Sequence, residues 1–150
     1  MKTETLVTHT PGETEAFAAK LAAELPEGSV LALYGNLGAG KTVFARGFAR
    51  GLGITEPISS PTFTILQEYP YNGKMFYHMD LYRIDNSDAA LAFGIDEFLY
   101  DQTAMTLLEW PERIEDILPP RTIILKIFFF TFHNIILDGF DLISNCVWFC

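Results

Sequence analysis

The chain has 150 residues, of which 49% are hydrophobic and 19% charged, and its formal net charge is −9. This composition predicts one globular domain with a sizeable core and excludes a disordered chain. An acidic chain repels the phosphates of nucleic acid, so strong direct binding to RNA is disfavoured and we expect a partner to hold any RNA.

A first helix is predicted from Thr10 to about residue 25. Thr10 is a suitable N-cap, Pro11 suits the first helical position, and Glu13 completes a capping box. Apolar residues then recur at every fourth position, namely Phe17, Leu21 and Leu25, and the segment Pro-Glu-Gly at 26–28 ends the helix.

A phosphate-binding loop is predicted directly after a buried strand. The strand is SVLALY, residues 29–34, which is apolar and uncharged as a buried parallel strand should be. It leads into GNLGAGKT, residues 35–42, which fits G-x-x-x-x-G-K-[ST] at every fixed position. The next segment, residues 42–53, is predicted to be a helix. Strand, loop and helix in this order are the context that a phosphate-binding loop requires.

The chemistry of such a loop depends on its backbone and on two side chains. Glycines let several N–H groups converge on phosphate oxygens. Lys41 adds a positive charge for the outer phosphates, and Thr42 offers its hydroxyl to Mg²⁺. The alternative, a glycine-rich turn with an incidental lysine, is disfavoured by the strand and helix on either side. The predicted nucleotide-binding residues of the loop are Gly35, Asn36, Leu37, Gly38, Ala39, Gly40, Lys41 and Thr42.

The second half of the chain is predicted to begin with a β-hairpin. Residues 61–70 alternate as a strand does, Asn72-Gly73 is typical of a tight turn, and a returning strand follows. Further elements are short helices at 88–94 and 111–118, a buried strand at 103–110 and a last strand that begins at 121. The whole pattern predicts an α/β fold, P-loop NTPase-like, with a mainly parallel central sheet flanked by helices and a β-hairpin.

Two predicted strands end in an acid, Asp80 and Glu109. Ligands of α/β sheets lie beyond the carboxyl ends of the strands, so we expect these acids to face the phosphates and to serve Mg²⁺. Either acid could instead be a solvated strand end, and Asp80 could pair with Arg83. Glu109 lies between Leu108 and Trp110, where a charge is costly without a partner.

Three further features have two interpretations each. The hydroxyl-rich segment 59–64 could reach a γ-phosphate or its metal, as switch segments do, or form an ordinary turn. His78 is predicted to pack in the core rather than to bind a ligand. Trp110 could stack on an adenine or fill the core.

Four segments together resemble the TsaE (YjeE) family of small bacterial ATPases, which are required for the threonylcarbamoyladenosine modification of tRNA. The segments are GNLGAGKTVFARGFARGLG, SPTFTILQEY, HMDLYRI and LLEWPERI, and the resemblance runs from about residue 13 to 121. It implies a P-loop ATPase that binds ATP and Mg²⁺, hydrolyses ATP slowly, and acts with the partner subunits TsaD and TsaB. The tRNA would be reached only through that complex.

The resemblance also implies roles for particular residues. Asp80 and Glu109 would be catalytic and, with Thr42, would serve the metal. Thr62 would belong to a switch-like loop, and Trp110 would lie in the nucleotide region. A small-molecule P-loop kinase is the alternative, although the chain has neither an Arg-rich lid segment nor room for an acceptor domain. A non-hydrolysing nucleotide-binding module is a third possibility.

The composition changes after residue 126. Residues 127–150 hold six of the 13 Phe and both Cys but no Lys or Arg, whereas the family usually continues with polar, Arg-bearing strands. We therefore divide the chain into a P-loop ATPase domain, 1–126, and an atypical hydrophobic tail, 127–150, that resembles an out-of-frame or replaced C-terminus. We expect the tail to be dispensable for nucleotide binding, and either poorly ordered or an ill-fitting cover on the sheet.

The sequence gives no sign of a membrane or redox function. Residues 1–10 lack the layout of a signal peptide. The longest apolar run, 123–137, is interrupted by Lys126 and His133, and it is shorter than the roughly 20 residues of a spanning helix. The two cysteines, Cys146 and Cys150, fit no metal or redox motif. We therefore expect a cytoplasmic protein.

Overall fold

The structure, a computed structural model, describes residues 2–128 and 145–149. In these residues seven strands form one sheet in the order β1-β7-β6-β2-β5-β4-β3. The strands are β1 (Lys2–Thr5), β2 (Val30–Tyr34), β3 (Leu66–Tyr71), β4 (Lys74–Asp80), β5 (Met105–Glu109), β6 (Ile123–Ile127) and β7 (Asn145–Phe149). Every neighbouring pair is parallel except the β3–β4 hairpin. The predicted α/β fold with a mainly parallel sheet and a hairpin is confirmed.

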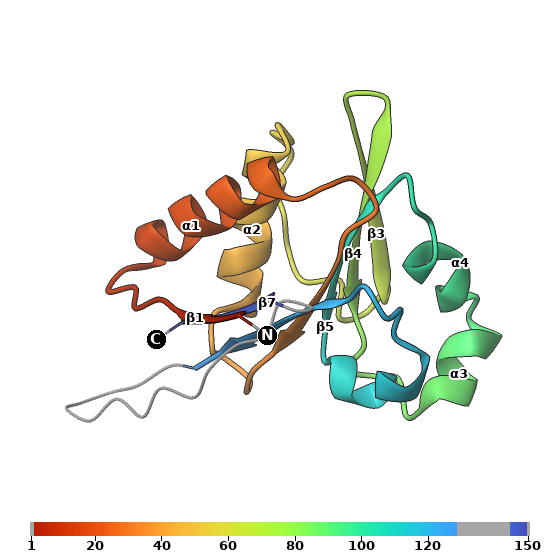
Figure 1. Ribbon diagram of the computed structural model, residues 1–150. Coiled ribbons are helices and arrows are strands. Elements are labelled where there is room, and N and C mark those ends of the chain that lie inside the picture. The colour runs from red at the N-terminus through yellow and green to blue at the C-terminus, as the bar shows by residue number, and fades with distance from the viewer. Residues whose placement is uncertain (1, 129–144, 150) are drawn as a thin grey trace.

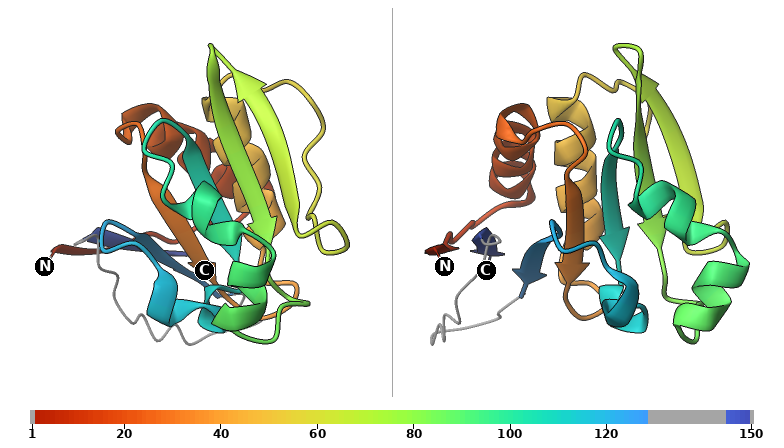
Figure 2. Two further views of the ribbon diagram at one scale, coloured as in Figure 1. Left: turned by 90° about the vertical axis from the view of Figure 1, so that its right-hand side faces the viewer. Right: turned by 45° about the vertical axis from the view of Figure 1, so that its right-hand side comes forward.

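Helices cover both faces of this sheet. The α-helices are α1 (Pro11–Glu24), α2 (Lys41–Gly51), α3 (Ser87–Ala92) and α4 (Ile95–Leu99), and two short 3₁₀ turns, η1 (Pro111–Arg113) and η2 (Glu115–Ile117), follow β5. Figure 1 shows α1 and α2 together on one side of the sheet and α3 and α4 on the other. The hairpin of β3 and β4 projects past the neighbouring strands in Figure 2.

The alternation of side chains along β2 explains why this strand is apolar throughout. Leu31 and Leu33 belong to the cluster under α1 and α2, whereas Val30 and Ala32 belong to the cluster on the opposite face. Successive residues of a strand point to opposite faces of a sheet. A strand covered on both faces therefore needs apolar residues at every position, as the sequence predicted for this segment.

Two glycines of α2 bring it against α1. A Cβ added to Gly47 would clash with the backbone carbonyl of Glu15, and one added to Gly51 would clash with that of Ala19. At the edge of the same contact, Arg46 of α2 forms an ion pair with Glu15 of α1, with Nη1 and Oε1 3.2 Å apart. The two helices therefore approach each other backbone to backbone.

The predicted start of α1 is confirmed. The Thr10 hydroxyl accepts a hydrogen bond from the Glu13 N–H at 3.2 Å, and Pro11 is the first helical residue. The Glu13 carboxylate accepts from the backbone N–H of His9 at 2.7 Å, one residue earlier than in a standard capping box.

Some predicted boundaries are wrong. The strand expected over 61–70 begins only at Leu66, because the N–H groups of Thr64 and Ile65 both bond the carbonyl of Pro61, at 3.1 and 2.7 Å, in a turn. Ile65 also has a left-handed backbone, with φ of 68°. The helix expected over 111–118 is instead the two 3₁₀ turns, and the one expected over 88–94 is α3, followed by a second short helix, α4.

The last predicted strand, β6, has a further neighbour. The strand β7 pairs parallel with β6 on one side and with β1 on the other, so part of the tail belongs to the sheet. Residues 129–144 and 150 of the tail lie outside the described residues, and the division at residue 126 stays a prediction.

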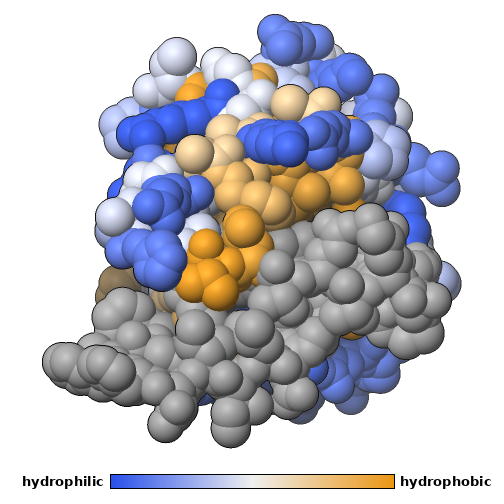
Figure 3. Space-filling model, turned by 60° about the vertical axis from the view of Figure 1, so that its left-hand side comes forward, coloured by the Kyte–Doolittle hydropathy of each residue, from blue (hydrophilic) through white to orange (hydrophobic). Residues whose placement is uncertain are grey.

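Apolar residues remain partly accessible on the side where α1 lies, as Figure 3 shows. Leu6, Phe17, Leu25 and Phe128 are among the partly buried residues that pack against the cluster under α1 and α2. No helix in the described part of the chain is long and apolar enough to cross a membrane.

Candidate phosphate-binding site

The predicted phosphate-binding loop joins β2 to α2 at the carboxyl end of the central strands. A Cβ at Gly35 would lie 2.5 Å from the carbonyl oxygen of Ile127, so only glycine lets the loop leave β2 this close to β6. Gly40 precedes α2 with φ of 104°, and a Cβ there would meet nothing within 4 Å. The backbone of the loop is therefore closely packed at Gly35, where it meets the sheet, and unobstructed at Gly40, where a ligand would approach.

The first turn of α2 gives this opening its electrostatic character. The first N–H groups of an α-helix have no partner within the helix, and the helix dipole adds positive potential at the same end. Because α2 begins at Lys41, these donors point toward the loop. The geometry fits an anion held by backbone groups, as the sequence pattern predicts.

Lys41 is folded back onto the loop. Its side chain is buried, with only 5% of the residue exposed. The ammonium nitrogen donates to the carbonyls of Gly35 and Asn36 at 2.5 and 3.1 Å, and it lies 4.2 Å from the centre of the Trp110 ring. Burial lowers the pKa of Lys41, and three nearby carboxylates, with Glu109 first, partly offset this shift.

Asp80 and Glu109 lie side by side in the sheet. They are paired in register at the ends of β4 and β5, and Glu109 is in turn paired with Leu33 of β2, two residues before the loop. Both are almost fully buried, with 2% and 3% of each residue exposed. Neither acid is therefore a solvated strand end, and the topology brings both to the strand that carries the loop.

The carboxylate of Asp80 holds the hydroxyl-rich segment. Its Oδ2 accepts from Thr62 Oγ1 at 2.7 Å and also from the Ser60 hydroxyl. Its Oδ1 accepts from the backbone N–H of Tyr82 at 3.0 Å. Thr62 thus lies beside Asp80, and its contact with nucleotide stays a prediction. Ser60 was not singled out, although it belongs to the same hydroxyl-rich segment.

The predicted alternative partner of Asp80, Arg83, lies elsewhere. Its guanidinium is 4.4 Å from the centre of the Phe63 ring, and the ion pairs of the described residues include none between Arg83 and Asp80. The Asp80 carboxylate is therefore held by neutral donors, and a cation could replace them.

Glu109 has a partner that sequence reasoning missed. Its Oε1 lies 3.0 Å from Nε2 of His78, and both side chains are buried. The prediction that His78 packs in the core is confirmed, since none of it is exposed. Its hydrogen bond to Glu109 depends on the register between β4 and β5, which no local pattern shows.

Trp110 packs against the edge of the core cluster and also borders the candidate site. Its backbone is left-handed, with φ of 61°, directly after β5. The ring is partly buried, lies 5.2 Å from that of Tyr82 between centroids, and faces the Lys41 ammonium. A contact with nucleotide stays a prediction.

The donor set fits Mg²⁺ held together with a nucleotide. Thr42, Asp80 and Glu109 would supply oxygen ligands, the type that Mg²⁺ prefers. Among the described residues no three His, Cys, Asp or Glu side chains gather closely enough to hold a metal themselves. Mg²⁺ usually keeps several waters and takes the rest of its ligands from one or two carboxylates and phosphates, so the sparse protein set is appropriate.

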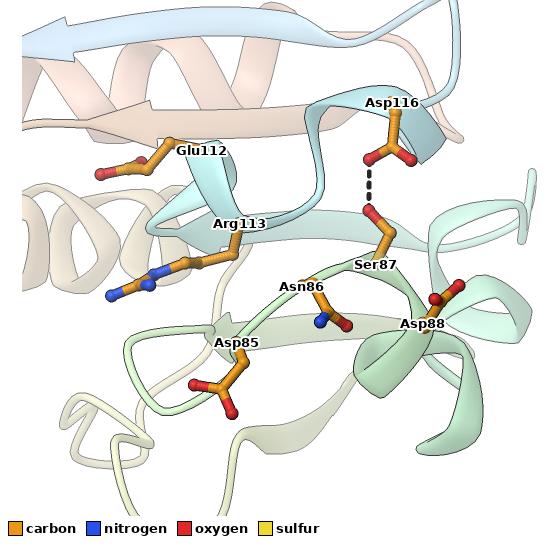
Figure 4. A pocket seen from close by; sticks show the side chains of 7 residues that line it. All are labelled: Asp85, Asn86, Ser87, Asp88, Glu112, Arg113 and Asp116. Carbon is orange, nitrogen blue, oxygen red and sulfur yellow. Dashed lines mark hydrogen bonds between the residues drawn. The ribbon is translucent and has the colours of Figure 1, made fainter.

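A separate pocket of about 450 Å³ lies between the start of α3 and the 3₁₀ turns. Figure 4 shows its lining, which is Asp85, Asn86, Ser87, Asp88, Glu112, Arg113 and Asp116. Carboxylates outnumber the one guanidinium in it, so its charge opposes phosphate binding. The anion site is therefore better assigned to the loop before α2.

A parallel sheet with a G-x-x-x-x-G-K-T loop leading into a helix defines a P-loop-type α/β protein. The family model described as "Threonylcarbamoyl adenosine biosynthesis protein TsaE" matches residues 8–131. The chain belongs to this family.

Curated relatives agree with this assignment. The chain is 49% identical over 109 residues to the tRNA threonylcarbamoyladenosine biosynthesis protein TsaE of Bacillus subtilis, covering 73% of this chain and 67% of that protein. It is 44% identical to the protein of the same name from Treponema pallidum over 69% of this chain and 75% of that one. The crystal structure of YdiB from Bacillus subtilis superposes with a TM-score of 0.64 at 43% identity, covering 79% and 73% of the two chains.

The match spans about two thirds of the length of the first of these relatives. The family name places the chain in threonylcarbamoyladenosine synthesis on tRNA.

Proposed function

We propose that the chain is an ATP-binding and slowly hydrolysing accessory factor in the N6-threonylcarbamoyladenosine modification of tRNA. Its nucleotide state would regulate the synthase formed by TsaD and TsaB, which alone would contact the tRNA. One observation carries the proposal, namely that Lys41 and two buried acids, Asp80 and Glu109, gather at the phosphate-binding loop of a TsaE-family chain.

Each residue has a task that follows from its position. The N–H groups at the start of α2 bind phosphate oxygens, and Lys41 leaves the loop carbonyls to pair with the outer phosphates. Thr42 and Asp80 would hold Mg²⁺, and Glu109 would orient the attacking water or share the metal. Mg²⁺ supplies positive charge that stabilises the phosphoryl group during transfer.

The contact of Asp80 with Ser60 and Thr62 links the nucleotide to the segment 59–64. If Asp80 turned toward a bound metal, it would give up part of its bonding to these hydroxyls. The segment would then change position or partners, as switch segments of other P-loop proteins do. Such a change is a physical route by which nucleotide state would alter docking on the synthase.

The decisive experiment measures ATP consumption by the chain alone, with TsaD and TsaB, and with a panel of small phosphate acceptors. We expect slow hydrolysis alone and faster hydrolysis with the two subunits. Phosphate transfer to a small acceptor would support the kinase alternative and contradict the proposal.

Two variants connect this activity to the candidate site. Asp80→Asn and Glu109→Gln should reduce hydrolysis far more than ADP binding, because a charge near the metal matters most in the transition state. Glu97→Gln, an exposed acid on α4, is the matched control and should behave as wild type. Unchanged hydrolysis in both site variants would remove the acids from the mechanism.

A further inference from the structure

We propose that His78 is a positioning residue, which holds the Glu109 carboxylate in the orientation that ATP hydrolysis requires. The inference rests on the proposed function, because it concerns how Glu109 is set for that reaction. Three observations carry it, namely the place of the ring in the sheet, its single hydrogen bond and the burial of both partners.

His78 lies on the same face of the sheet as the two acids. His78 and Asp80 are two residues apart on β4, so their side chains share one face. Glu109 is opposite Asp80 in register, which puts His78 on the diagonal to it on that same face. Below, the ring stacks on Phe76, with centroids 6.3 Å apart and planes inclined by 15°. Among the described residues, the ring therefore lies between an apolar ring, Phe76, and a polar partner, Glu109.

That contact is a hydrogen bond of defined direction. The Nε2 atom of His78 is 3.0 Å from Oε1 of Glu109. The ionised form of Glu109 only accepts, so for this form Nε2 carries the proton and donates it. The other nitrogen, Nδ1, is buried with no hydrogen-bond partner among the described residues. Within the described part of the chain, the polar partner of the ring is thus Glu109 alone.

A purely structural histidine does not account for this arrangement. An apolar side chain would fill the same space without burying an unpaired nitrogen, which is unfavourable. What the imidazole supplies and an apolar group does not is the donor to Oε1. A carboxylate with one oxygen fixed in this way has a defined orientation for its other oxygen, which is the atom left to act on metal or water.

Three substitutions of His78 distinguish the effect of its hydrogen-bond donor from the effect of its side-chain volume. In His78→Gln the side-chain amide nitrogen takes the place of Nε2 and can still donate to Glu109. In His78→Leu the volume is kept and the donor is lost. In His78→Asn the shorter amide corresponds to the Nδ1 side of the ring and does not reach Glu109, so this variant controls for polarity alone.

The first readout is steady-state hydrolysis with TsaD and TsaB, together with the melting temperature of each variant. We expect His78→Leu and His78→Asn to lose about tenfold or more in kcat, the range typical of residues that orient a catalytic group, with KM for ATP changed little. His78→Gln should retain most of kcat whatever its melting temperature. Equal loss in the Gln and Leu variants, or a loss of kcat that follows the melting temperature, would overturn the proposal.

The second readout is a double-mutant cycle with Glu109→Gln. If His78 acts only through Glu109, His78→Leu should cause little further loss once Glu109 is changed. Fully additive losses would show that the histidine acts independently of Glu109 and would contradict the inference.

A binding measurement separates this inference from the proposed function. The gain in ADP affinity on adding Mg²⁺, measured by calorimetry, should fall in His78→Leu and be restored in His78→Gln. If the wild-type chain consumes no ATP with the two subunits, the proposed function fails, yet this Mg²⁺ dependence still tests His78. An equal gain in all three proteins would overturn the positioning role.

Discussion

The ammonium of Lys41 lies 4.2 Å from the centre of the Trp110 ring while it donates hydrogen bonds to two carbonyls of its own loop. The chain itself thus satisfies the charge of Lys41. A nucleotide that used Lys41 would have to draw the ammonium away from the ring and the carbonyls.

The first prediction concerns this lysine. Lys41→Ala removes the charge that pairs with the outer phosphates but keeps the backbone cradle. We expect ATP affinity to fall by about tenfold or more, where each factor of ten corresponds to about 1.4 kcal/mol. Calorimetry measures the affinity, and Lys20→Ala, on the exposed side of α1, is the control. Wild-type affinity in the Lys41 variant would contradict the assignment.

The second prediction concerns the contact between α1 and α2. In Gly47→Ala the new methyl group would meet the Glu15 carbonyl, so we expect the free energy of unfolding to fall by about 1–3 kcal/mol. Gly12→Ala is a matched control, because a Cβ there meets only the Thr10 hydroxyl, at 3.8 Å. That variant should be neutral or slightly stabilising, since alanine favours a helix over glycine. Urea unfolding compares the two, and equal effects would mean that the helices are not in close contact.

The third prediction concerns stability in acid. The side chain and backbone N–H of Thr103 donate to Asp101 at 2.7 and 2.8 Å, and Tyr77 donates at 3.2 Å. The hydrogen bonds from Thr103 hold the pKa of Asp101 below its ordinary value. The carboxylate of Asp101 therefore binds a proton more tightly in the unfolded chain than in the folded one. Its ionised form stabilises the fold above the ordinary pKa of an aspartate, and this stabilisation is lost as the pH falls through the pKa of Asp101 in the folded chain.

Asp101→Asn should consequently lower the free energy of unfolding at pH 7 by about 1 kcal/mol, the usual contribution of such hydrogen bonds. The difference from wild type should shrink below about pH 4, the ordinary pKa of an aspartate. Urea unfolding at pH 7 and at pH 3 checks the sign. A difference that stays constant between the two would show that the charge of Asp101 is not involved.

The fourth prediction concerns the tail. β7 separates β1 from β6, so a chain ending at Phe128 leaves β1 without its neighbour and makes β6 an edge strand. We expect ATP binding to persist, because the loop, Asp80 and Glu109 all lie on β2, β4 and β5 or next to them. The melting temperature should fall, and an exposed strand edge favours association. Complete loss of folding would show that the tail is part of the core and that the division at residue 126 is wrong.

Local sequence patterns predicted most of the central elements. The uncharged run that forms β2 and the Asn72-Gly73 turn needed no distant partner to be recognised, and both residues of that turn have positive φ, 46° and 76°. A turn at Pro61 was one of the two interpretations of the segment before β3, but its extension to Ile65 was not expected, because Ile65, a β-branched residue, adopts a left-handed backbone that its propensity opposes. Its geometry is set by two hydrogen bonds to Pro61, which a propensity argument does not include.

The strands β1 and β7 were missed for a different reason. β1 has only β7 as a neighbour, and β7 lies far along the chain in a segment of unusual composition. Pairing between distant segments leaves little local signal, because the alternation of a short edge strand is weak. Knowledge of the partner strand is needed to recognise either of them.

The candidate site was predictable in part. The loop pattern and the rule that ligands lie at the carboxyl ends of strands identified Lys41, Asp80 and Glu109. The donors to the two acids, Ser60 and His78, were not identified, because each contact joins different segments of the chain. The register between strands decides which side chains of neighbouring strands lie beside each other, and register is a property of the folded sheet.

The close contact of Gly47 and Gly51 in α2 with the backbone of α1 restricts how these two helices can move. A helix whose backbone touches that of its neighbour can neither turn about its axis nor slide without a collision at Gly47 or Gly51. The loop that precedes α2 is therefore attached to a helix that packs closely against α1. If nucleotide binding displaces part of the site, we therefore expect the displacement in the segment 59–64, which Asp80 holds through Ser60 and Thr62, and not in α2.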